Sequence, residues 1–119
     1  MGDLAKNFSR AEFACKCGCM GDTVDFQLLQ LLQQLRDDLR VRVRIVSGYR
    51  CADHNRKVQG SPNSQHLRGK AADIQVDGFN PGQIFDYICA HVPENKFGVG
   101  LYSTFVHVDV RDRRARWIE

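Results

Sequence analysis

The chain has 119 residues and a mass of 13.6 kDa, which fits one compact domain and leaves no room for a second of typical size. Hydrophobic residues make up 43% and charged residues 26% of the chain, a balance that excludes disordered, collagen-like and coiled-coil proteins. The formal net charge of +3 is too mild to indicate nucleic-acid binding, although it is compatible with an anionic polymer as partner.

The amino-terminal residues 1–6 lack the basic and then apolar pattern of a signal peptide. No apolar run in the chain approaches the ~20 residues that a membrane span needs. The sequence therefore predicts a protein that is made in the cytoplasm without a signal peptide and has no membrane span.

Cysteines are concentrated near the amino terminus, where Cys15, Cys17 and Cys19 form the segment CKCGC. The chain has five cysteines, and an odd number excludes a fully paired disulfide framework, so we expect reduced thiols. This density raises the possibility of zinc, but structural zinc sites usually have C-x(2–4)-C pairs or are completed by histidine. We expect small, buried or half-buried residues at the edge of the fold, with a structural metal as the alternative.

Residues 24–39 predict the main core helix, because leucines and other apolar residues recur at spacings of three and four. Asp22 or Thr23 is expected to cap this helix. From residue 39 to residue 45, apolar residues alternate with arginines, which is typical of a strand with one solvent-exposed face. We expect this strand to end at residues 47–48.

The second half of the chain predicts a loop, three strands and one helix. The loop covers residues 50–63 and contains a short helical stretch near residues 53–58. The dipeptide Asn80-Pro81 is a helix start signal, and Ser103-Thr104 is short enough to join two strands in a hairpin. The expected strands cover residues 70–76, 97–102 and 105–110, and the expected helix covers residues 81–91.

Two of the four histidines, His66 and His107, stand near carboxylates. His66 closes a polar loop, and Asp73 follows seven positions later in a strand. In the segment FVHVDV, the two-residue period of a strand places Phe105, His107 and Asp109 on one face. Two imidazoles and one carboxylate from neighbouring strands would give three zinc ligands and a fourth position open for water, as in catalytic zinc sites. The alternative for each histidine is a hydrogen-bonded structural residue.

Three segments, SGYR (47–50), SQHLRGKAADI (64–74) and FVHVDVR (105–111), resemble the M15 family of zinc peptidases, the D-Ala-D-Ala carboxypeptidase type. The family signature S-x-H-x-x-G-x-A-x-D is matched at Ser64, His66, Gly69, Ala71 and Asp73. The opening NFSRAEFACKCGC is similar to the amino terminus of short phage and bacterial members. The resemblance implies a small α+β domain, over residues 1–119, whose antiparallel sheet holds the metal and packs on helices.

By this resemblance His66, Asp73 and His107 are the zinc ligands, and Arg50 and Ser64 contact the substrate. The zinc would polarise the scissile carbonyl and make hydroxide available at neutral pH. The permanently charged guanidinium of Arg50 suits a substrate carboxylate or the developing oxyanion. The alternative for Arg50 is a surface salt bridge.

The general base is missing from its usual place. Many members carry an acidic residue three positions before the last ligand, where this chain has Thr104, and the histidine of the H-x-H form is replaced by Phe105. The ending F-V-H-V-D looks more like the subgroup with an H-x-D ending, which includes murein endopeptidases. We expect Asp109 to be the base, or alternatively the acceptor that orients His107.

The resemblance implies hydrolysis of amide bonds in the peptide stem or cross-links of peptidoglycan, by a carboxypeptidase or endopeptidase in wall lysis or remodelling. We expect a monomer that acts on the cell wall as a phage lysis enzyme, or an excised domain of a secreted enzyme. The basic tail would attract an anionic wall or form a solvated edge; it comprises Arg111, Arg113, Arg114 and Arg116. The alternatives are a non-catalytic zinc-binding module and a phage structural component that binds the wall.

Overall fold

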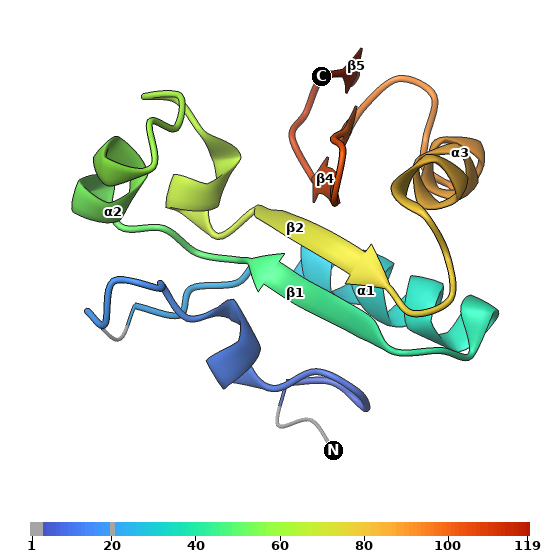
Figure 1. Cartoon of the computed structure of the whole chain (residues 1–119), viewed down its shortest axis with the longest axis horizontal. Helices are drawn as coiled ribbons and strands as arrows, with labels where there is room; N and C mark the ends of the chain where they lie inside the picture. The colour runs from blue at the N-terminus through green and yellow to red at the C-terminus, as the bar shows by residue number, and fades with distance from the viewer. Residues whose placement is uncertain (1–3, 20) are drawn as a thin grey trace.

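A computed structural model describes residues 4–19 and 21–119, and shows a five-stranded sheet with helices packed around it (Figure 1). The strand order is β1-β2-β4-β3-β5. The strands are β1 (Val43–Ser47), β2 (Ala71–Val76), β3 (Gly98–Leu101), β4 (Val106–Asp109) and β5 (Ala115–Ile118). Neighbouring strands are antiparallel except for β3 and β5, which are parallel. The predicted α+β class is confirmed. The sheet is mixed, and not purely antiparallel as expected, because β5 pairs in parallel with β3. Strand β5, at the end of the basic tail, was not predicted.

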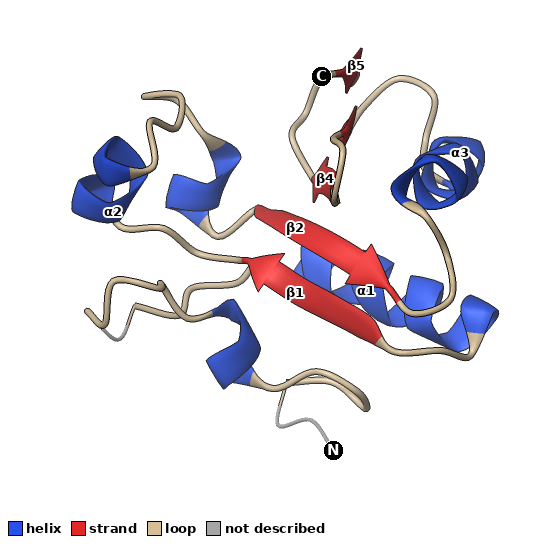
Figure 2. Cartoon of the chain, viewed as in Figure 1, coloured by secondary structure: helices blue, strands red, loops and turns tan. Residues whose placement is uncertain are grey.

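Across the residues that the structure describes, three α-helices and two 3-10 helices complete the fold (Figure 2). They are η1 (Arg10–Phe13), α1 (Phe26–Leu39), α2 (Ala52–Lys57), η2 (Gln65–Arg68) and α3 (Pro81–His91). None of the helices in the described part of the chain is long and apolar enough to cross a membrane.

Helix α1 starts later, and strand β1 starts later, than the sequence predicted. The N-cap is Asp25, whose carboxylate accepts hydrogen bonds from the amides of Gln27 and Leu28, so the expected caps Asp22 and Thr23 were wrong. Leu39 still belongs to the helix, which closes at Arg40 in the left-handed conformation with φ of 57°. The alternating pattern therefore begins before the chain has left the helix, and β1 starts only at Val43.

The other elements that the sequence predicted lie within a few residues of their predicted positions, whereas η1 and η2 were not predicted. The short helix expected near residues 53–58 is α2, and the helix expected at residues 81–91 is α3. Asn80 caps α3 in a capping box with Gln83, as the Asn80-Pro81 signal predicted. Strands β3 and β4 form the predicted antiparallel hairpin.

The sheet has one apolar face and one face with polar side chains, which include Asp73 and His107. On β2, Ala72, Ile74 and Val76 belong to the hydrophobic core, as do Val106 and Val108 on β4. Four leucines of α1 and two isoleucines of α3 fill the same core. Because successive side chains of a strand point to opposite faces, the residues between these core positions face the other way.

Candidate metal centre

Strand pairing places two of the three predicted ligands directly opposite each other. Asp73 on β2 is the cross-strand partner of His107 on β4, and opposite side chains on neighbouring strands lie close together. His107 Nδ1 lies 3.0 Å from Asp73 Oδ1, and His66 Nε2 lies 3.2 Å from the same oxygen. All three side chains are buried. The structure thus brings the three residues to one point.

His66 is fixed by the 3-10 helix that carries it. Ser64 caps η2, and its Oγ accepts a hydrogen bond of 3.2 Å from the backbone amide of His66. The helix ends at Gly69 with φ of +68°, and a Cβ at that glycine would also collide with the backbone of Thr23. His66 Nδ1 lies 2.7 Å from the carbonyl oxygen of Gly48. Because a carbonyl oxygen only accepts, Nδ1 donates, and the lone pair of Nε2 points toward Asp73.

His107 is oriented in the same way by Asp109. Its Nε2 lies 2.7 Å from Asp109 Oδ2, and since an ionised carboxylate only accepts, Nε2 carries the proton. The lone pair of Nδ1 is left facing Asp73. The Asp109 side chain is fully buried and also accepts hydrogen bonds from the Gly98 amide and from the amide and guanidinium of Arg111.

Asp73 is held through its second oxygen. Arg50 Nη2 lies 3.3 Å from Asp73 Oδ2, which leaves Oδ1 facing the two imidazoles. The guanidinium of Arg50 is itself held by Asn55 Oδ1 at 3.2 Å and Ser47 Oγ at 3.4 Å. Arg50 therefore forms a salt bridge inside the site, rather than on the surface.

Both carboxylates of the site are ionised at neutral pH. Burial by itself raises the pKa of Asp73, but when the imidazoles carry protons on both nitrogens, hydrogen bonds from His107 and His66 outweigh burial and hold that pKa well below its usual range. Burial also raises the pKa of Asp109, and hydrogen bonds from His107 and Arg111 lower it further than burial raises it. Burial lowers the pKa of His107, whereas the hydrogen bonds that its doubly protonated ring donates to Asp109 and Asp73 raise that pKa above the ordinary value.

The donor set fits a divalent cation. With each imidazole proton on the nitrogen that faces Gly48 or Asp109, two nitrogen lone pairs and one carboxylate oxygen converge without a donor between them. Such a buried group of acceptors is costly unless a proton or a metal cation joins them. The three ligand atoms lie within 4.8 Å of one another. Two histidines and one carboxylate are a ligand set that suits zinc and leaves a position open.

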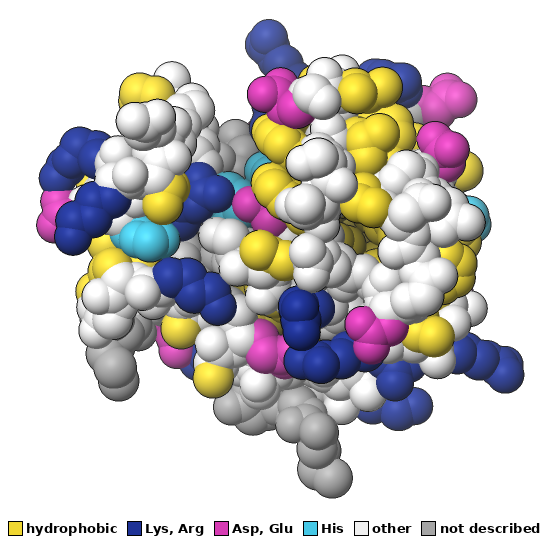
Figure 3. Space-filling model, in the orientation of Figure 1, with side chains coloured by type: hydrophobic (Ala, Val, Ile, Leu, Met, Phe, Trp, Pro, Cys, Tyr) yellow, Lys and Arg dark blue, Asp and Glu magenta, His cyan; other side chains and the backbone are white. Residues whose placement is uncertain are grey.

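The three residues lie at the floor of a cleft of about 600 Å³. Figure 3 shows histidine, acidic and basic side chains gathered in a hollow beside the α2 region. Arg50 and Ser64 line this cleft, as do the aromatic side chains of Tyr102, Phe105 and Trp117. Asp73 is the only carboxylate among the lining residues, all of which the structure describes. Thr104 does not line the cleft, and its carbonyl instead accepts from Gln75.

A family model described as peptidase M15 matches residues 6–109, which include His66, Asp73 and His107. The chain belongs to the peptidase M15 family. This match confirms, at the level of the family, the resemblance that the three sequence segments indicated. Members of the family are metallopeptidases. No curated protein matches the chain.

Sequence reasoning missed several residues that support the site of this M15 peptidase. Gly48, Asn55 and Arg111 each hold a ligand or a residue next to a ligand. The segment FGVGLY contained a usable signal, because its two glycines leave space for larger neighbours. A Cβ at Gly98 would lie 2.7 Å from Asp109 Oδ1, and one at Gly100 would enter the ring of Trp117.

Proposed function

We propose that the chain is a zinc-dependent peptidase that hydrolyses amide bonds in the peptide stem or cross-links of peptidoglycan. The observation that carries this proposal is the convergence of His66 Nε2, Asp73 Oδ1 and His107 Nδ1 at the floor of a cleft, in a chain of the M15 family. Zinc bound by these three atoms supplies Lewis-acid chemistry and acidifies water.

Asp109 is proposed as a positioning residue for His107. The sequence left two roles open for Asp109, general base and orienting acceptor. A general base must reach the water or substrate, yet Asp109 does not line the cleft, its side chain has no exposed surface and both of its oxygens accept hydrogen bonds. These observations favour the orienting role, which fixes the tautomer and the ring of His107.

Arg50 is proposed to have two tasks. A guanidinium has five N–H donors, and three of those of Arg50 are engaged by Ser47, Asn55 and Asp73. The side chain lines the cleft, so its remaining donors can bind a substrate carboxylate or the oxygen that gains charge during hydrolysis. Ser64 lines the same cleft and is proposed to contact the substrate beside its role as a cap.

The bond that is cut can be identified with defined muropeptides. Zinc-loaded protein is incubated with a stem peptide that ends in D-Ala-D-Ala and, separately, with a cross-linked muropeptide dimer, and the products are identified by mass spectrometry. Loss of one alanine from the stem indicates a carboxypeptidase, and conversion of dimer to monomers indicates an endopeptidase. If neither substrate is cut at any zinc concentration, the proposed peptidoglycan substrate is wrong.

A second candidate is a non-catalytic module that holds zinc and binds the wall. It is favoured by one observation, that no carboxylate except the proposed ligand Asp73 lines the cleft. This candidate predicts that the protein sediments with purified peptidoglycan but leaves every muropeptide intact.

A further inference from the structure

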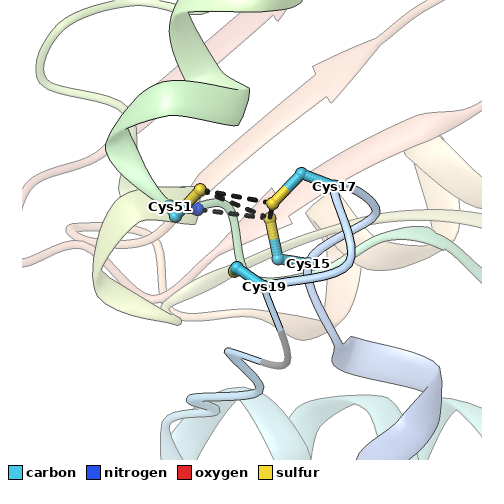
Figure 4. Close-up of side chains that lie close together, drawn as sticks. All are labelled: Cys15, Cys17, Cys19 and Cys51. Carbon is cyan, nitrogen blue, oxygen red and sulfur yellow. Dashed lines mark hydrogen bonds between the residues drawn. The ribbon is translucent and has the colours of Figure 1, made fainter.

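Four cysteine side chains meet at a point away from the His-Asp-His centre. Cys15, Cys17 and Cys19 lie in the segment after η1, and Cys51 is the residue that precedes α2 (Figure 4). The Sγ of Cys15 lies 3.4 Å from that of Cys17 and 3.8 Å from that of Cys51, and the sulfurs of Cys17 and Cys51 are 3.5 Å apart. All four sulfurs lie within 4.8 Å of one another.

We propose that Cys15, Cys17, Cys19 and Cys51 bind a second, structural zinc ion. Zinc with four thiolates is tetrahedral with Zn–S bonds of about 2.3 Å, which places neighbouring sulfurs about 3.8 Å apart. The three sulfur–sulfur distances among Cys15, Cys17 and Cys51 agree with this value to within a few tenths of an ångström. Because all four positions of zinc would be filled by protein, the site is closed to water and substrate.

Disulfides explain this arrangement less well. A disulfide requires a sulfur–sulfur distance of about 2.05 Å between two partners. Here each of three sulfurs lies near two others at similar distances, and all five cysteines of the chain are free. Near-equal spacing among several sulfurs is what a shared central ion requires.

Backbone amides support the negative charge that four thiolates would bring. The amide of Cys51 donates to Cys15 Sγ at 3.4 Å, and the amide of His54 donates to Cys51 Sγ at the same distance. When zinc binds, four S–H bonds break, four Zn–S bonds form and four protons pass to solvent.

The site joins the amino-terminal segment to the stretch that supports the first metal centre. The amide of Tyr49 donates to the carbonyl of Phe13 at 2.9 Å, and Gly48 packs so closely on Phe13 that a Cβ would lie 2.7 Å from its Cα. The carbonyl of Gly48 orients His66, and Arg50, next to Cys51, holds Asp73. A zinc ion at Cys51 therefore anchors the backbone on which the first centre depends.

The sequence raised a metal at Cys15, Cys17 and Cys19 only as the alternative, because the C-x-C-x-C segment lacks the usual pair spacing and the fourth cysteine, Cys51, lies far along the chain. The preference for small, buried or half-buried cysteines over a structural metal rested on local spacing alone. The proposal replaces it with an arrangement that only the folded chain displays.

The test counts metal in the whole chain, purified under reducing conditions and saturated with zinc. We expect two zinc equivalents in the unaltered protein, one in Cys17→Ser, one in His66→Ala and none in the double variant. Cys89→Ser is the matched control, because Cys89 lies on α3 outside the cluster, and it should keep two. The zinc equivalent lost in Cys17→Ser tests the second site. The proposed function depends only on the other zinc equivalent, which is lost in His66→Ala, so the two can fail independently.

A second measurement keeps the test valid if a variant fails to fold. Cobalt added to the unaltered metal-free protein should give the intense charge-transfer bands of cobalt–thiolate coordination, and Cys17→Ser should weaken them. The proposal is overturned by a single zinc equivalent that Cys17→Ser retains, by a disulfide among these cysteines in the reduced and zinc-saturated protein, or by iron in place of zinc.

Discussion

Asp109 connects His107, a proposed metal ligand, to the protein interior through both of its oxygens. One oxygen accepts from His107, and the other accepts from Gly98 and Arg111. The side chain therefore decides which nitrogen of His107 is free to bind a metal. Residues that orient a metal ligand in this way affect metal affinity more than the chemical step.

Asp109→Asn should therefore weaken zinc binding at the His-Asp-His centre by roughly 10-fold to 100-fold, with peptidase activity recovered in excess zinc. The affinity is measured by competition with a chromophoric chelator, and activity is measured across a zinc titration. Asp112→Asn is the control, because Asp112 is exposed and close in sequence. Unchanged zinc affinity with activity lost at saturating zinc would assign Asp109 the role of general base instead.

Strand β3 has a glycine, Gly100, at the position next to His107 and Trp117. Gly100 is paired with His107 on one side and with Trp117 on the other. A side chain at this position would enter the space of the Trp117 ring, which forms one wall of the cleft. The absence of a side chain at Gly100 thus leaves room on this face of the sheet for His107 of β4 and Trp117 of β5.

Gly100→Ala should destabilise the protein by about 1–3 kcal/mol, since the added methyl overlaps a packed indole ring in the middle of a sheet. The free energy of unfolding is measured by denaturant titration. Gly82→Ala is the control, because Gly82 lies in α3 and its added Cβ would meet only Asn80 Oδ1 at 3.4 Å. Equal stability of Gly100→Ala and the unaltered protein would contradict this packing.

The elements that the sequence predicted well are those with local signals. The Asn80-Pro81 start signal and the leucine spacing of residues 24–39 placed α3 and α1, and the two-residue period placed His107 and Asp109 on one face. The left-handed turn at Arg40 has no such signal, because arginine rarely adopts it. Strand β5 also has none, since it pairs with a strand of the same direction and its sequence ARWI is too short to show a period.

The site was predictable to the extent that its residues share a strand face or a family signature. The signature indicated His66 and Asp73, and strand periodicity added His107. Their roles as metal ligands remain predictions. The supporting atoms, such as the carbonyl of Gly48 and the thiol of Cys51, become neighbours of the site only through folding, so spacing in the sequence could not reveal them.

On the scale of the whole molecule, two candidate metal clusters flank one short stretch of backbone. Residues 47–51 contribute Gly48 and Arg50 to the first centre and Cys51 to the second. The same stretch begins at the last residue of β1 and hydrogen-bonds to the amino-terminal segment through Tyr49. Ligands that bind the folded chain but not the unfolded one stabilise it by mass action.

Removal of zinc should therefore lower the thermal unfolding midpoint. A free zinc concentration of 100 times the dissociation constant contributes about 2.7 kcal/mol per independent site. The midpoint is measured by calorimetry on zinc-saturated protein and on protein stripped with a chelator, then again after zinc is restored. Identical midpoints in all three samples would show that neither cluster binds zinc in the folded state.

The most direct test of the account is the release of peptide fragments from purified cell walls at saturating zinc. The unaltered protein, His66→Ala and His91→Ala are compared side by side, since His91 lies on α3 outside the cleft. We predict fragments of the peptide stem from the unaltered protein and from His91→Ala, and a loss of release in His66→Ala. Release that is equal in all three proteins, or absent in all three, would contradict the assignment of the His66, Asp73 and His107 centre as the site of a peptidoglycan peptidase.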